Sequence, residues 1–234
     1  MTLKIANTDI NDDGVQNERE IEEHVAKTDP SHRGYPLFQT FSVFFDVTGP
    51  EGKHLCLAYP PMREPFWLYQ RRFNDGLIPL PLVKTYILFL LAGLDYLHSS
   101  CRVVHTGNRI PSHFVLCTGC TLTRALDLKL ENIMVSFEDP AVLGDFMNAH
   151  LDEPVPYKTD LTGRHIYRSD NNFGPLRSLR NILPRIVDFG GATRLGEDEG
   201  GIYPIQPDHY RAPEVILGCG WKMNTDIWNL GTLV

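Results

Sequence analysis

Cysteine is scarce in this chain, and it has neither a long apolar run nor a signal peptide. Five cysteines in 234 residues are an odd number, which favours free thiols in a reducing compartment over a disulfide framework. No stretch approaches the ~20 apolar residues of a membrane helix, and the first residues lack the shape of a secretion signal. We therefore expect an intracellular protein, in the cytoplasm and/or the nucleus, with no membrane partner. The cysteines are Cys56, Cys101, Cys117, Cys120 and Cys219.

Positive charge is also in deficit. The chain has 22 Lys and Arg against 29 Asp and Glu, a net charge of -7. This balance argues against direct nucleic-acid binding, while the acidic run at 197–199 could attract a basic peptide. Because 42% of the residues are hydrophobic, the chain can bury a core as one domain or two small lobes. The oligomeric state is not indicated.

Four short motifs follow one another in a fixed order. Each alone has an ordinary structural reading, such as a turn or a helix cap. In this order and spacing they supply what phosphoryl transfer needs: carboxylate and amide oxygens for a metal ion, and a carboxylate for the acceptor hydroxyl. The combination therefore predicts a protein kinase. The motifs are Asp127-x-Lys129-x-x-Asn132, Asp188-Phe189-Gly190, Tyr210-Arg211-Ala212-Pro213-Glu214 and Asp226-x-Trp228-x-x-Gly231.

Roles follow from the chemistry of each motif residue. Asp127 is expected to orient the substrate hydroxyl and accept its proton, with Lys129 near the transferring phosphate. Asn132 and Asp188 are the expected ligands of Mg²⁺. ATP and Mg²⁺ are thus the predicted cofactors.

The alternating stretch Thr2–Ile5 predicts a strand, and its position before the motifs makes Lys4 the candidate phosphate-binding lysine. The alternative is a solvated terminal lysine without a function. No Gly-rich loop precedes Lys4.

A helix is predicted from Asn17 to Lys27. Glu18 is followed by Ile21 and Val25 at spacings of three and four, so it lies on the apolar face of that helix. We therefore expect Glu18 to pair with the strand lysine. Glu20, whose neighbours at the same spacings are polar, is the alternative.

Two further strands are predicted, at Phe38–Asp46 and Lys53–Tyr59. The second ends at the prolines 60–61, which have no N–H, so Met62 is the first residue able to both donate to and accept from an adenine edge. Tyr59 is expected to guard the pocket behind the base. Alone, the segment is equally a strand that prolines terminate.

The rest of the chain is predicted to be mainly helical. Glu64–Phe73 and Leu80–Ser99 have helical spacing, and the second is a core helix. Short strands are predicted at Ile133–Val135 and Arg185–Val187. We interpret Ser136–Asn181, which is polar and rich in Pro, Asp and Gly, as an extended excursion.

Twenty residues, 107–126, interrupt the motif region and contain no acidic side chain. The genetic code allows Gly107-Asn108, Leu122-Thr123 and Leu126-Asp127 to be written with a splice donor, a branch sequence and an acceptor. Our hypothesis is that the insert is a retained intron. The alternative is a genuine loop, whose Cys117-x-x-Cys120 is a lone pair and a poor zinc site.

Without that insert the chain reads His105-Thr106-Asp127, which resembles the SR-protein-specific kinases, in a fungal-type form. That branch has Thr where most protein kinases have Arg. The resemblance covers nearly the whole chain and implies a serine/threonine kinase that transfers the γ-phosphate of ATP to a protein substrate, with a preference for basic Arg/Ser-rich proteins. Two features depart from the branch: Phe189 stands where Leu is usual, and the spacer at 134–184 is short.

The implied fold class is α+β, a bilobal kinase-like fold truncated at both ends. We expect residues 1–62 to form an incomplete small lobe with the hinge, and 63–234 a truncated helical large lobe. Glu214 is expected to be buried without a partner, which would make the chain marginally stable. The alternative functions are a catalytically inactive fragment or a noncatalytic binding module, and a small-molecule phosphotransferase is less favoured.

Overall fold

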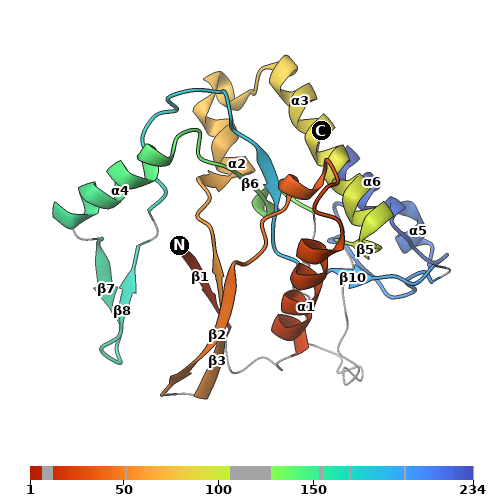
Figure 1. Cartoon of the computed structure of the whole chain (residues 1–234), viewed down its shortest axis with the longest axis horizontal. Helices are drawn as coiled ribbons and strands as arrows, with labels where there is room; N and C mark the ends of the chain where they lie inside the picture. Colours follow the sequence, from red (N-terminus) through yellow and green to blue (C-terminus); the bar gives the residue numbers. More distant parts are fainter. Residues whose placement is uncertain are drawn as a thin grey trace.

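The computed structural model describes residues 1–6, 13–50, 52–105, 128–152, 155–168, 170–197 and 199–233. A small sheet and one helix lie toward one end, and most of the remaining helices lie toward the other (Figure 1). This mixture of helix and strand confirms the α+β class. The insert at 107–126, with Thr106 and Asp127 beside it, lies outside the described residues.

The small sheet has three antiparallel strands in the order β1-β3-β2, which are Thr2–Ile5, Gly52–Tyr59 and Val43–Gly49. The first and third predicted strands are therefore confirmed. The middle one begins at Val43 rather than Phe38, because Phe38 turns into the main core and bridges Ile186 instead.

Helix α1 spans Asp13–Thr28, four residues longer at its start than predicted. Ile21 and Val25 are buried in the main core together with Leu94 and Phe189. The predicted register of the helix is therefore correct, and its apolar stripe fixes which side chains face the neighbouring strand.

Helix α3 spans Leu80–Asp95 and continues as a π-helical turn, Tyr96–Ser100. The sequence expectation that no stretch approaches a membrane span is wrong by length and composition, because Leu80–Ser100 qualifies. Leu90, Leu94 and Leu97 of this stretch are buried in the main core. In this fold the stretch is a core helix.

A second sheet joins three short strands in the order β4-β6-β9: Glu64–Pro65, Ile133–Val135 and Pro184–Ile186. The predicted helix at 64–73 is thus wrong at its start. Pro65 takes an extended conformation, and the helix α2 is confined to Phe66–Tyr69.

Shorter elements connect these parts. A pair of strands, β5 (Val103–Val104) and β10 (Thr193–Arg194), is antiparallel. The 3-10 turns are Tyr35–Leu37, Gln70–Arg72, Asn74–Gly76 and Leu130–Asn132.

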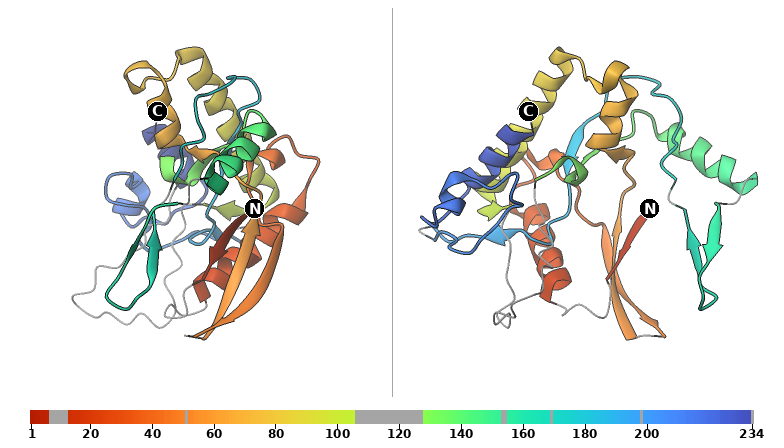
Figure 2. Two further views of the ribbon diagram at one scale, coloured as in Figure 1. Left: turned by 90° about the vertical axis from the view of Figure 1, so that its left-hand side faces the viewer. Right: turned by 180° about the vertical axis from the view of Figure 1, so that it is seen from behind.

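The region at 136–181 is not the extended excursion that its composition predicts. It contains helix α4 (Pro140–Asp152) and a hairpin of β7 (Tyr157–Thr159) and β8 (His165–Tyr167). Figure 2 shows these elements projecting to one side. The sequence contains a signal for the start of α4, an Asp followed by a Pro in the first turn. In the structure the Asp139 side chain caps the helix by accepting from the Ala141 N–H at 2.9 Å.

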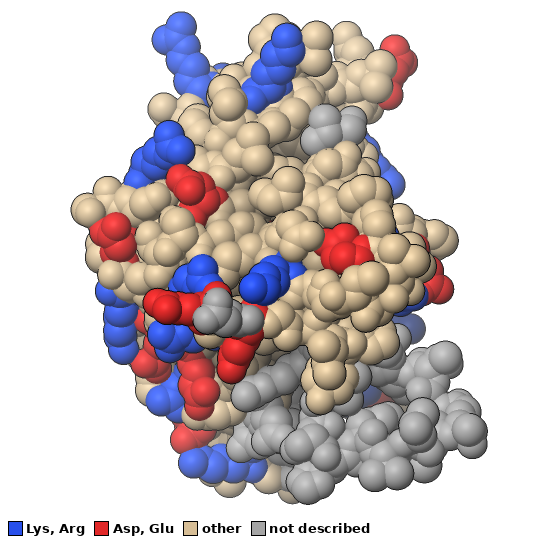
Figure 3. Space-filling view, turned by 90° about the vertical axis from the view of Figure 1, so that its right-hand side faces the viewer, with Lys and Arg blue, Asp and Glu red and all other residues tan. Residues whose placement is uncertain are grey.

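The chain ends with α5 (Pro213–Ile216) and α6 (Asn224–Thr232). The expectation of a buried, unpaired Glu214 is wrong, since this side chain is partly exposed and accepts a hydrogen bond from Asn224. On the face shown in Figure 3, acidic and basic side chains are interspersed and wide areas carry no charge.

Candidate active site

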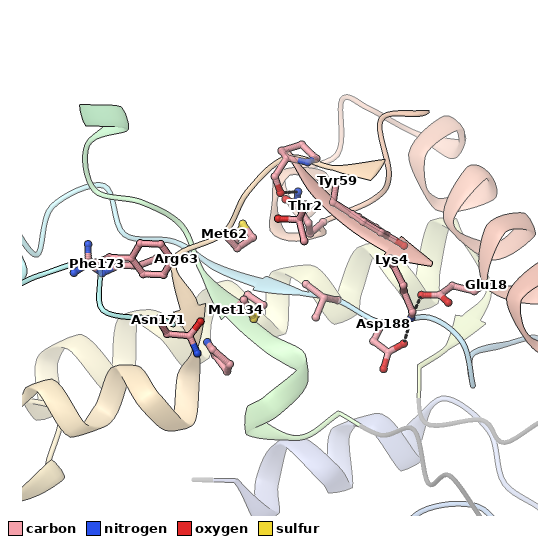
Figure 4. Close-up of a pocket in the computed structure, with 14 residues that line it drawn as sticks. Thr2, Lys4, Glu18, Tyr59, Met62, Arg63, Met134, Asn171, Phe173 and Asp188 are labelled. Atoms are coloured by element: carbon pink, nitrogen blue, oxygen red, sulfur yellow. Dashed lines mark hydrogen bonds and ion pairs between the residues drawn. The ribbon is translucent and has the colours of Figure 1, made fainter. Parts of the chain in front are cut away.

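Lys4 lies at one end of a cavity, between two carboxylates from distant parts of the chain. Its Nζ is 2.6 Å from Glu18 Oε1 and 2.9 Å from Asp188 Oδ1 (Figure 4). The ion pair predicted between Lys4 and Glu18 is therefore present. Residues 184 positions apart meet because β1 pairs with β3 and α1 packs on the core that holds Phe189.

The electrostatics keep this lysine charged. Burial disfavours the ammonium, but Glu18 and Asp188 outweigh it and raise the pKa of Lys4. Burial raises the pKa of Glu18, whose side chain is 4% exposed, and the ammonium offsets part of that effect. Lys4 is thus a positive charge held by carboxylates inside a cavity.

Asp188 follows strand β9 in an unusual backbone conformation, with a φ of 66°. A non-glycine residue at positive φ carries strain that the surrounding packing must hold. The next residue, Phe189, is fully buried, with ring contacts to Phe38 at 5.9 Å and His105 at 5.2 Å. This packing fixes the direction in which the carboxylate points.

Two residues with oxygen ligands for a hard cation adjoin neighbouring strands: Asn132 directly precedes β6, and Asp188 lies two residues after β9. The Val187 N–H donates to the Asn132 carbonyl at 3.0 Å, which aligns Asn132 with the residue before Asp188. An amide and a carboxylate fit Mg²⁺, which prefers oxygen ligands. Only one Asp188 oxygen, Oδ1, is bonded to Lys4. Among the described residues, no group of three or more His, Cys, Asp or Glu side chains forms a metal cluster.

The Tyr59 side chain also lines the cavity near Lys4, and its hydroxyl donates to Glu22 Oε1 at 3.0 Å. The other end of the cavity is formed by the residues that follow β3, among them Met62 and Arg63 (Figure 4). Within the described residues the backbone N–H and C=O of Met62 form no hydrogen bond, whereas Arg63 N–H donates to Val135 O. Met62 therefore keeps a donor and an acceptor for a ligand, as its position after two prolines predicts.

Gln39 was missed by the sequence reasoning. It is buried, and its amide nitrogen donates to the Pro60 carbonyl at 2.9 Å, while its oxygen accepts from Arg185 at 2.8 Å. No local sequence pattern indicates a side chain that forms hydrogen bonds to two segments far apart in the chain.

The cavity measures about 390 Å³, within the usual range for small-molecule sites. It brings together Lys4, Glu18, Tyr59, Met62 and Asp188 of the predicted site. The other lining residues are Thr2, Gln39, Pro60, Arg63, Pro65, Met134, Asn171, Phe173 and Val187. Met134 and Val187 lie within two residues of the motif residues Asn132 and Asp188, so the motifs could have predicted them. Asn171 and Phe173 belong to the region 136–181, whose structure was predicted wrongly.

The catalytic assignments are less complete in the structure. Asp127 lies outside the described residues. Lys129 and Asn132 are described but do not line the cavity. Lys129 lies at the start of the 3-10 turn that ends at Asn132, whose backbone N–H donates to the Lys129 carbonyl at 2.8 Å.

Comparisons with known proteins agree with this geometry, although no protein-family profile matches the chain. A serine/threonine protein kinase of Aspergillus fumigatus is 31% identical over 221 residues, covering 94% of this chain and 47% of that protein. The serine/threonine-protein kinase SRPK of Physarum polycephalum is 27% identical over 238 residues, covering 95% and 50%. AFC2 of Arabidopsis thaliana is 25% identical over 181 residues, covering 77% and 33%.

A crystal structure of a kinase domain has the same fold, with a TM-score of 0.60 at 22% identity, over 99% of this chain and 54% of that one. The chain spans about half the length of the curated relatives it matches first. It has a protein-kinase fold, and the proteins that it resembles over most of its length are serine/threonine protein kinases, among them fungal, SRPK and AFC kinases.

Proposed function

We propose that this chain carries the nucleotide site of an ATP-dependent protein serine/threonine kinase. The observation that carries the proposal is the placement of Lys4 between Glu18 and Asp188 at one end of a cavity. At the other end, the backbone N–H and C=O of Met62 form no hydrogen bond with any residue that the structure describes. A nucleoside triphosphate has a base edge and a polyanion at opposite ends, so its chemistry matches that of the cavity.

Each residue then has a role in the transfer. Bound ATP with Mg²⁺ supplies the γ-phosphoryl group, and Lys4 would hold phosphate oxygens while Glu18 fixes the ammonium. Asp188 and Asn132 would hold the metal ion. The substrate hydroxyl oxygen forms a bond to the γ-phosphorus as the bond to the ADP oxygen breaks, and Asp127 accepts the hydroxyl proton. Lys129 would lie near the transferring phosphate.

The proposed substrate is a basic, Arg/Ser-rich protein. Support comes from the name of the Physarum relative and from the net charge of -7, which favours a cationic partner. We also propose an intracellular site of action, which the odd number of cysteines supports.

Binding of Mg·ATP is the first test. Thermal shift and calorimetry would be run on the 234-residue chain, on a version without residues 107–126, and on Asp188→Asn in both. We expect ATP to raise the melting temperature only when Mg²⁺ is present, and Asp188→Asn to remove most of that rise. If neither version binds ATP in the presence of Mg²⁺, the proposed function is wrong.

Phosphate transfer is measured separately, with radiolabelled ATP and an Arg/Ser repeat peptide against a Lys/Ser control. Transfer to the Arg/Ser peptide supports the kinase. Binding without transfer to either peptide would instead favour the noncatalytic binding module.

A further inference from the structure

A segment following the β7–β8 hairpin forms part of the wall of the nucleotide cavity. Asn171 and Phe173 line the cavity with Arg63 and Met62, at the end opposite Lys4 (Figure 4). They are more than 100 positions away from Met62 in the sequence. Their presence there therefore needs a physical cause.

Two arginines, Arg63 and Arg72, hold this segment in place through its backbone. The Gly174 carbonyl accepts from Arg63 Nη2 and from Arg72 Nη1, both at 2.7 Å. Arg63 is fully buried and also donates through Nη1 to both Glu138 oxygens, at 3.1 and 3.0 Å. Gly174 has a φ of 73°, which a residue with a Cβ adopts only with strain. The segment is thus held by charge-assisted hydrogen bonds in a conformation suited to glycine.

Aromatic packing anchors the same segment from behind. The Phe173 ring lies 4.6 Å from the Phe146 ring of α4 and 5.1 Å from the Phe137 ring. The Phe173 N–H also donates to the Asn171 carbonyl at 3.0 Å, which closes a tight turn. The packing of Phe173 and this turn therefore hold the backbone of Asn171 in place.

The polar side chains at this end of the cavity differ in whether they form hydrogen bonds with other residues. Gln39 is bonded to Pro60 and Arg185, and Arg63 to Glu138 and Gly174. The carboxamide of Asn171, by contrast, forms no hydrogen bond with any described residue. Asn171 is exposed at the cavity mouth, with the apolar side chains of Pro65, Met134 and Phe173 also lining the cavity.

We propose that Asn171 determines the sugar specificity of this site by hydrogen bonding to the ribose hydroxyls of the nucleotide. This proposal rests on the proposed function. Because the sugar is bonded to the base, a nucleotide with its base edge at Met62 and its phosphates at Lys4 has its sugar beside the end of the cavity that Asn171 lines. A carboxamide offers a donor and an acceptor to a vicinal diol, which itself both donates and accepts.

The experiment compares ATP with 2′-deoxy-ATP by calorimetry in the presence of Mg²⁺, on whichever form of the chain binds ATP. The variant is Asn171→Ala, and the matched control is Asn172→Ala. Asn172 is the adjacent exposed asparagine, and it lines a different cavity, beside α4. The wild type is expected to bind ATP roughly 3- to 10-fold more tightly than 2′-deoxy-ATP, the size of one hydrogen bond. Asn171→Ala should weaken ATP by at least that factor and weaken 2′-deoxy-ATP less, because 2′-deoxy-ATP has only the 3′-hydroxyl contact to lose, so the preference for ATP falls.

The outcomes separate the two proposals. If the wild type does not bind ATP at all, the proposed function fails and this proposal fails with it. If the wild type binds ATP and 2′-deoxy-ATP equally, only the sugar contact is refuted. The same conclusion follows if Asn171→Ala weakens both nucleotides equally, or if it retains the preference that Asn172→Ala retains.

Discussion

Glu22 makes the stability of the fold depend on pH, and Glu22→Gln should remove that dependence. The side chain is fully buried one turn after Glu18 on α1. Its Oε2 accepts from the Phe41 N–H at 2.8 Å and its Oε1 from the Tyr59 hydroxyl at 3.0 Å. Burial, and then the charge of Glu18, raise its pKa from 4.5 to about 8, although the two hydrogen bonds and Lys4 act in the opposite direction.

The sign of the effect follows from proton linkage. Between pH 4.5 and about 8 the folded chain keeps the Glu22 proton and the unfolded chain loses it, so stability falls as pH rises. The contribution is fully present below the unfolded pKa and is lost by the time pH passes the folded pKa. At about 1.4 kcal/mol per pH unit, the loss between about pH 6 and about pH 8 is roughly 2–3 kcal/mol.

Glutamine can replace the protonated acid without titrating. Its oxygen accepts from Phe41 N–H and its nitrogen donates to the Tyr59 oxygen, so both contacts survive. We expect urea unfolding of Glu22→Gln to lose roughly 2–3 kcal/mol less than wild type between about pH 6 and about pH 8.

The control for this experiment is Glu23→Gln. Glu23 is the adjacent residue, and hydrogen bonds from Lys27 and then Arg19 lower its pKa, so it is ionised throughout this window. Glu23→Gln should keep the wild-type slope of stability against pH. Equal slopes for wild type and Glu22→Gln would refute the reasoning.

Three further outcomes are expected. Glu18→Gln should weaken phosphate transfer at least ~10-fold while Glu20→Gln leaves it near wild type, because Glu18 bonds Lys4 and shares the apolar face of α1, which Glu20 does not; equal rates would contradict the assignment. Arg63→Leu should cost about 3–5 kcal/mol in urea unfolding, because it leaves Glu138 charged and buried without its partner. Arg71→Leu, at an exposed arginine over an aromatic ring, should cost at most about 1 kcal/mol. Similar losses for the two arginine variants would contradict a stabilising role of the buried Arg63–Glu138 ion pair.

Sequence reasoning found the part of the site whose chemistry tolerates few residue types. Asp188 was predicted for the site from its place in an ordered series of motifs, and the structure brings its carboxylate beside Lys4; its role as a metal ligand stays a prediction. Glu18 was separated from Glu20 because helical spacing decides which carboxylate shares a face with Ile21 and Val25. Both inferences needed only local patterns.

The parts that sequence reasoning missed depend on tertiary contacts. Arg63 reaches Glu138 and Gly174, which lie 75 and 111 positions away, and no local pattern encodes that distance. The role of Gln39 likewise exists only after Pro60 and Arg185 have been brought together. Polar composition alone made the region of α4 look irregular, although its cap at Asp139 was present in the sequence.

Helix α1 contacts two neighbouring residues of the cavity. Glu18 bonds Lys4, and Glu22, one turn later, bonds Tyr59. Both carboxylates lie on the side of the helix that also buries Ile21 and the following turn in the core. Because one rigid helix makes both contacts, a shift of α1 that breaks the Lys4 pair also withdraws the acceptor from Tyr59. The position of this helix therefore affects both the ion pair of Lys4 and the placement of the Tyr59 ring beside it.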